Sequence, residues 1–82
     1  MDKDKYSVTS LALAAAIQLA SNGKLLGVEK VSDKQSAFVF EKTSDLVQIV
    51  EKFYKKDLLL DAFSYFESLR YIKSILYRER GK

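Results

Sequence analysis

The sequence predicts an α+β fold in which a small antiparallel sheet packs against helices, in the order α-β-β-α-α. One observation is an uncharged apolar run, residues 11–20, which has the composition of a buried helix. Residues 25–31 and 37–41 show the two-residue period of strands, and two stretches after residue 43 show the spacing of helices. Because 82 residues can bury one core, we expect residues 1–82 to form a single domain.

The first helix is predicted to begin near Thr9, whose hydroxyl suits an N-cap, and to end at Asn22-Gly23, a pair suited to a left-handed C-cap. Its apolar residues occupy most of the circumference, so the helix must be covered on at least two sides. The polar strip that is left consists of Ser10, Ala14, Gln18 and Ser21.

The apolar run of this helix also has features of a targeting peptide. It is shorter than the ~20 residues that span a bilayer. Asp2 and Asp4 offset the charges of Lys3 and Lys5 before it, and Gln18-Leu19-Ala20 is a poor cleavage pattern. We therefore interpret the run as part of the core, and we expect no membrane association.

Two strands are predicted to form a hairpin around a turn at residues 32–35. In the first strand Leu26 and Val28 alternate with Gly27 and Glu29, and in the second Phe38 and Phe40 alternate with Ala37 and Val39. We expect both phenylalanines to face the core. A lone hairpin is marginally stable in water, so residues 6–8 are predicted to add a third strand.

A second helix is predicted from a cap at Thr43 or Ser44 to about Lys55, with Asp45 where the helix dipole favours an acid. Its apolar face consists of Leu46, Val47, Ile49, Val50, Phe53 and Tyr54. Residues 58–60 fit a buried connector, a short strand or an early helical turn, because a short apolar run has no diagnostic period. Asp61 is the predicted N-cap of the last helix, which runs to about Arg78.

The last helix carries more apolar surface than one core contact requires. Its core stripe is predicted to be Ala62, Tyr65, Phe66, Leu69, Ile72 and Leu76. Phe63, Ile75 and Tyr77 lie outside this stripe, and a monomer would leave several of them exposed. These three residues are therefore the predicted protein interface, for a homo-oligomer or for a protein partner.

The C-terminal stretch holds all of the excess positive charge. Residues 1–69 contain nine basic and ten acidic residues, hence −1, whereas residues 70–82 carry five basic residues against one acid, hence +4. This cluster is a candidate nucleic-acid contact, because arginines attract phosphates and tyrosines stack on bases. It equally fits a helix end that complements the dipole, followed by a solvated tail. Its members are Arg70, Lys73, Arg78, Arg80 and Lys82.

Lys73 falls within the predicted apolar stripe, where a buried ammonium is unfavourable unless it is paired. One interpretation is a functional lysine with a lowered pKa, or half of a salt bridge. The other is that the stem lies along the apolar surface while the ammonium reaches water.

The residue types exclude most catalytic chemistry. The chain has no Cys and no His, which excludes disulfides, thiol nucleophiles, imidazole catalysis and most transition-metal sites, and favours a cytoplasmic location. Its three glycines form no phosphate-binding loop. Asp57 and Asp61 would have to converge in an apolar cleft to act as an acid–base pair, whereas a loop and a cap position already account for them. We therefore expect no enzyme activity, no cofactor and no metal.

Five segments along the chain form a recognisable pattern: TSLALAA at residues 9–15, GKLLGVE at 23–29, FVFE at 38–41, VEKFY at 50–54, and Leu69-Arg70 followed by KSILY at 73–77. In this pattern the chain resembles a family of small domains of unknown function found in bacteria, archaea and phages. The resemblance implies a standalone cytoplasmic domain, often in mobile-element settings, with no known activity. No catalytic residue is carried over from it.

Three functional hypotheses follow. The first is a non-catalytic interaction module that self-associates or docks a protein partner through apolar helical surfaces, on the last helix and on the nearly uncharged first one. The alternative is an accessory nucleic-acid-binding protein, of mobile-element origin, that uses the basic C-terminal helix. A hydrolase built on carboxylates is the third, and it would need a pocket that holds two acids.

Overall fold

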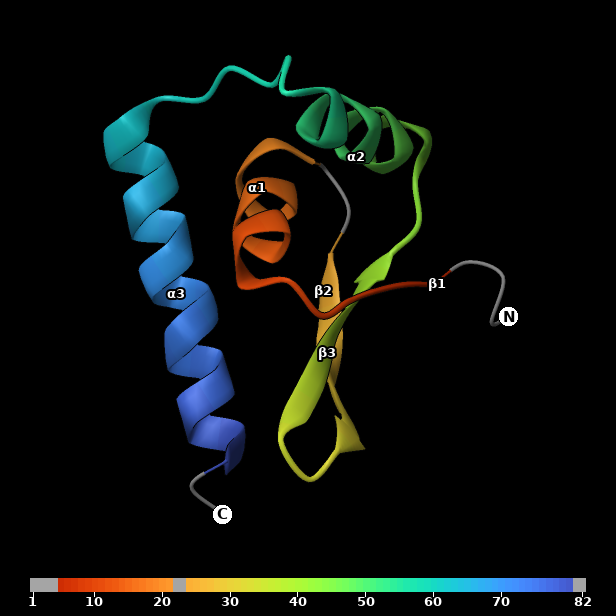
Figure 1. Cartoon of the computed structure of the whole chain (residues 1–82), viewed down its shortest axis with the longest axis vertical. Helices are drawn as coiled ribbons and strands as arrows, with labels where there is room; N and C mark the ends of the chain where they lie inside the picture. The colour runs from red at the N-terminus through yellow and green to blue at the C-terminus, as the bar shows by residue number, and fades with distance from the viewer. Residues whose placement is uncertain (1–4, 22–23, 81–82) are drawn as a thin grey trace.

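Figure 1 shows the computed structural model of the protein, which describes residues 5–21 and 24–80 apart from the side chains of Glu79 and Arg80. The chain forms an α+β fold with an antiparallel sheet, as the sequence predicts, and the predicted N-terminal strand is present. The elements in chain order are β1 (Lys5–Val8), α1 (Leu11–Ala20), β2 (Leu25–Ser32), β3 (Gln35–Glu41), α2 (Ser44–Lys55) and α3 (Ala62–Arg80).

The sheet has the strand order β1-β3-β2, with both neighbours antiparallel to β3. Phe38 of the central strand pairs with Val8 on one side and with Val28 on the other. Phe38 and Phe40 are among the largest fully buried side chains, which confirms that they face the core. The added strand gives the hairpin the third member that its stability requires.

Strand β2 departs from regular alternation at its start. Leu25 lies opposite Phe40 and Gly27 lies opposite Val39, so two steps along β2 match one step along β3. This bulge turns the Leu26 side chain to solvent, where it is 51% exposed, while Leu25 and Val28 pack against the core. The predicted pairing of Leu26 with Val28 on one face is wrong, because the extra residue shifts the alternation.

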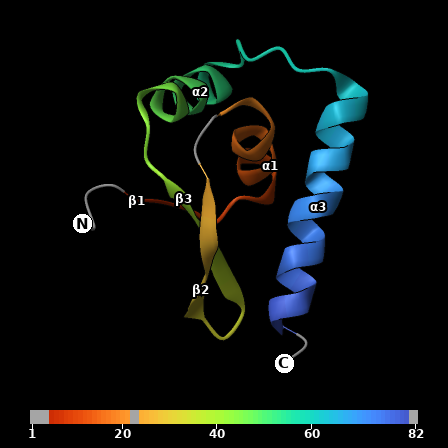
Figure 2. The same cartoon turned by 180° about the vertical axis from the view of Figure 1, so that it is seen from behind.

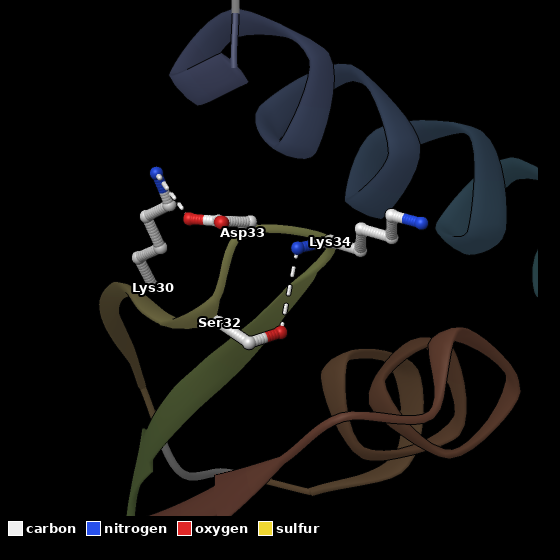
Figure 3. Close-up of polar contacts among 4 residues, drawn as sticks. All are labelled: Lys30, Ser32, Asp33 and Lys34. Atoms are coloured by element: carbon white, nitrogen blue, oxygen red, sulfur yellow. Dashed lines mark hydrogen bonds and ion pairs between the residues drawn. The ribbon is translucent and has the colours of Figure 1, made fainter.

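The hairpin turn lies within the predicted residues 32–35, and Figure 3 shows its polar contacts. The backbone N–H of Lys34 donates to the hydroxyl of Ser32 at 3.3 Å. The ammonium of Lys30 lies 4.0 Å from the carboxylate of Asp33, and both side chains are exposed to solvent. Water screens an exposed pair of this kind, so the backbone pairing of the strands does most to hold the turn.

Helix α1 occupies the centre of the molecule, between α3 and the sheet, with α2 across one end (Figures 1 and 2). It contacts α3, α2 and β1. Ala14, Ala15, Ala16 and Ile17 are fully buried, which small alanine side chains allow by letting neighbouring elements approach closely. The predicted covering on at least two sides is confirmed, and Ala14, which was expected in the polar strip, is buried with the rest.

The beginning of α1 differs from the predicted cap by one residue. The N-cap is Ser10 rather than Thr9, because the Ser10 hydroxyl accepts from the backbone N–H of Leu13 at 3.2 Å. At the other end the backbone N–H of Ser21 donates to the carbonyl of Ile17 at 2.9 Å. The expected C-cap at Asn22-Gly23 lies outside the described residues.

Helix α2 follows its prediction closely. Its N-cap is Thr43, whose hydroxyl accepts from the N–H of Leu46 at 3.2 Å and donates to Asp45 at 2.6 Å. It ends at Lys55, and Lys56 follows as the C-cap with a left-handed φ of 63°. Leu46 is buried at the contact with the core, whereas Val47 and Tyr54, both predicted on the apolar face, are exposed.

Residues 58–60 form a connector outside any helix or strand, which resolves the ambiguity in the sequence. Leu58 and Leu60 are half-buried, and Leu59 between them is 92% exposed.

Candidate protein-binding surface

The first turn of α3 is held by Asp61, as predicted. Its carboxylate accepts from the backbone N–H of Ser64 at 2.8 Å, and its carbonyl accepts from the N–H of Tyr65 at 2.9 Å. The backbone N–H of Ser64, followed by its hydroxyl, lowers the pKa of the Asp61 carboxyl below its ordinary value. The folded helix therefore favours the ionised form of the Asp61 carboxyl.

Two side-chain hydrogen bonds fix the orientation of α3 against α1. The buried hydroxyl of Ser68 donates to the carbonyl of Ala15 at 2.8 Å, and the hydroxyl of Tyr65 donates to the carbonyl of Ala12 at 3.0 Å. Ile72 is fully buried one turn after Ser68. The side of α3 that faces the core is therefore centred on Ser68 and Ile72.

This orientation corrects two sequence predictions. Phe66, predicted in the core stripe, is 58% exposed, and Ala62 at the start of the stripe is exposed as well. Ile75, predicted as part of a protein interface, is half-buried and packs against the core cluster. The physical reason is that an apolar pattern wider than one face does not show which of its edges turns inward.

The outward face of α3, defined here as Phe63, Phe66, Glu67, Arg70, Tyr77 and Arg78, lies on the opposite side of the helix. Phe63 is 72% exposed and Tyr77 is 64% exposed, so two of the three predicted interface residues face solvent. With Phe66, and with aromatic side chains of about 200 Å² each, they leave roughly 400 Å² of aromatic surface uncovered. In both Figure 1 and Figure 2, α3 flanks the molecule and no other element lies beyond it.

The predicted basic residues are placed on or beside this face. Arg70, Lys73 and Arg78 are all exposed, and Arg70 lies 3.5 Å from the carboxylate of Glu67. Lys73 is therefore at the surface rather than within an apolar stripe. The side chain of Arg80 and the whole of Lys82 lie outside the described residues.

A shallow hollow of about 420 Å³ lies beside the outward face, between α1 and α3. Phe63, Leu19 and Tyr71 contribute its apolar lining, and Glu67 lies at its wall. Sequence reasoning missed Leu19, because its position in an uncharged run predicts burial. Only the packing of α1 shows that this end of the run reaches the surface.

A second hollow, of about 390 Å³, lies between α1, the end of α2 and the connector. Ala16, Phe53, Leu58 and Leu60 line it, with Lys56 as its cation. Neither Asp57 nor Asp61 lines this hollow or the one beside α1, so the structure does not bring these two carboxylates together in either of them.

The described part of the chain contains no helix that is both long enough and apolar enough to cross a membrane. Among the side chains that the structure describes, no three or more acidic groups gather into a cluster that could hold a metal ion.

A family model described as "Domain of unknown function (DUF5659)" matches residues 3–78 of the 82-residue chain. Neither a curated protein nor a solved structure matches the chain.

Proposed function

Because the chain belongs to the DUF5659 family of domains of unknown function, we propose its function from its surface: it is a non-catalytic interaction module. The outward face of α3 binds protein, either a further copy of the chain or a different partner. The exposure of Phe63, Phe66 and Tyr77 on a single helix face carries this proposal.

Two physical arguments support it. Isolated exposed apolar residues are ordinary, but several large exposed apolar side chains gathered on one face mark a binding surface in many small proteins. Tyrosine and arginine are also the residue types that contribute most at protein interfaces, and Arg70 and Tyr77 lie on this face.

Replacing all three aromatics by serine tests the proposal. We expect Phe63→Ser/Phe66→Ser/Tyr77→Ser to remove concentration-dependent association in sedimentation velocity, or to lose a protein that the wild type co-purifies from its host. Tyr54→Ser is the matched control, because Tyr54 is an exposed aromatic on α2 and should change neither result. A wild type that stays monomeric and co-purifies the same proteins as the triple variant would sink the proposal.

The second candidate function is nucleic-acid binding, favoured by Arg70, Lys73 and Arg78, which are all exposed on α3. Tyr77 offers a ring on which a base can stack. An accessory protein of this kind, encoded on a mobile element and acting in the cytoplasm, would bind through phosphate contacts.

The dependence of DNA binding on salt concentration distinguishes nucleic-acid binding from protein binding. Phosphate contacts predict binding to single- or double-stranded DNA that weakens steeply as salt rises, with Arg70→Ala and Arg78→Ala each reducing the slope. Fluorescence anisotropy at low salt measures this directly. Absence of binding at low salt removes the nucleic-acid candidate and leaves protein binding.

A further inference from the structure

The arrangement of charges and rings on the outward face of α3 suits a second copy of the same helix. Phe66 and Tyr77 are eleven residues apart, and so are Glu67 and Arg78. Eleven residues make three helical turns, so each pair lies within about 20° on one line of the helix, about 16 Å apart. The face therefore carries an aromatic edge and a charged edge with the same spacing.

We propose that the protein forms a two-fold dimer in which the α3 helices of two copies pack antiparallel, with the symmetry axis near the level of residue 72. In this register Phe66 lies opposite Tyr77 of the second copy, and Glu67 lies opposite Arg78 of the second copy. Two-fold symmetry forms each contact twice. The inference rests on the proposed function, and it names the partner and the geometry.

Self-complementarity is the reason for choosing a second copy over a different protein. In an antiparallel pair related by a two-fold axis, each edge of a helix face meets the same edge of its partner. The aromatic edge thus meets rings and the charged edge meets the opposite charge, because Glu67 and Arg78 share one edge. The central Arg70 lies at the level of Ser74 of the second copy. The two copies of Arg70 lie about 6 Å apart along the helices, and each is 3.5 Å from the carboxylate of Glu67 in its own chain.

The available area is consistent with a stable dimer. Helix α3 has 19 residues, and at about 1.5 Å per residue it presents roughly 28 Å of length. The exposed rings supply roughly 400 Å² per copy, and the stems of the charged side chains beside them extend this toward the ~800 Å² per partner of a typical specific interface.

Charge reversal tests the register on the full chain. Glu67→Lys and Arg78→Glu each replace two attractive contacts by two repulsive ones, so each should weaken dimerisation by about tenfold in sedimentation equilibrium. The double variant Glu67→Lys/Arg78→Glu restores both pairs with exchanged signs and should return to within about threefold of the wild type.

The matched control is Glu67→Lys/Lys73→Glu, which has the same net charge as the wild type. Lys73 lies about 120° around the helix from Glu67, on the other edge of the face. This variant should therefore stay as weak as Glu67→Lys alone. Circular dichroism of every variant establishes that the fold is intact.

Two results would overturn the inference and are distinguishable from failure of the proposed function. If the wild type dimerises and the triple serine variant does not, yet Glu67→Lys/Arg78→Glu is no stronger than the single variants, the face binds but this arrangement is wrong. If the wild type is monomeric while its capture of a host protein depends on Phe63, Phe66 and Tyr77, binding stands and the dimer does not.

Discussion

Helices α1 and α3 are both rich in apolar residues, yet the molecule uses them in opposite ways. In α1 the residues from Leu13 to Ile17 are all buried, because α3, α2 and the sheet surround it. In α3 Ile72 is the one fully buried apolar side chain among those described, and four aromatic side chains are exposed: Phe63, Phe66, Tyr71 and Tyr77. The apolar content of a helix therefore predicts that its surface will be buried. Only the fold shows whether the burying element belongs to the same chain.

The largest expected contrast comes from truncating one large side chain in each helix. Ile17→Ala should lower the free energy of unfolding by about 2–5 kcal/mol, because it opens a cavity at a fully buried position. Phe63→Ala should change it by less than about 0.5 kcal/mol, because the ring is mostly exposed within one chain. Urea denaturation at low protein concentration measures both, and equal losses would show that α3 is buried like α1.

A smaller effect is expected at the bond that joins the two helices. Ser68→Ala removes the buried hydrogen bond to the carbonyl of Ala15 and should destabilise the fold by about 1 kcal/mol. Ser74→Ala is the control, because the Ser74 hydroxyl is exposed and donates within its own helix to Tyr71. If both variants have the same stability, the bond from Ser68 does not hold α3 against α1.

The smallest effect is expected at the start of α3, where it depends on pH. The pKa of Asp61 is lower in the folded chain than in the unfolded chain, so its stabilising effect is complete above the unfolded-state pKa and is lost as pH falls through the folded-state pKa. Asp61→Ala should therefore be less stable than the wild type at neutral pH, with a difference that shrinks on acidification. Thermal denaturation across acidic and neutral pH checks this, and a difference that is constant with pH contradicts it.

Local chemistry was sufficient to predict most of the fold. The sequence predicts Asp61 as a cap, and Thr43 or Ser44 as another, because a hydroxyl or carboxylate just before an apolar run has one common role; the structure places the second cap at Thr43. The α1 cap was misplaced by one residue because Thr9 and Ser10 offer the same group. The bulge that exposes Leu26 was not predictable, since it follows from the register against β3 rather than from the residues of β2.

The candidate site was predicted in part, and for a physical reason. Counting apolar residues on the last helix showed that some must be exposed, and Phe63 and Tyr77 are. The sequence predicts Phe66 in the core and Ile75 at the surface, whereas the structure exposes Phe66 and packs Ile75 against the core. The prediction is wrong about which side of the helix faces inward. Ser68 fixes which side of α3 faces inward, because its small side chain allows close approach to α1 and its hydroxyl donates to the carbonyl of Ala15. A pattern of apolar residues cannot reveal this, because serine is polar.

The most direct test of the central claim compares phenylalanines within one molecule. With 4-fluorophenylalanine in place of all five phenylalanines, ¹⁹F NMR with a soluble paramagnetic agent reports which rings meet solvent. We predict that Phe38 and Phe40 are protected at every concentration, while Phe63 and Phe66 respond in dilute solution and become protected as the protein is concentrated. If Phe63 and Phe66 are as protected as Phe38 in dilute solution, or stay exposed at every concentration, the account of α3 as a self-associating surface is contradicted.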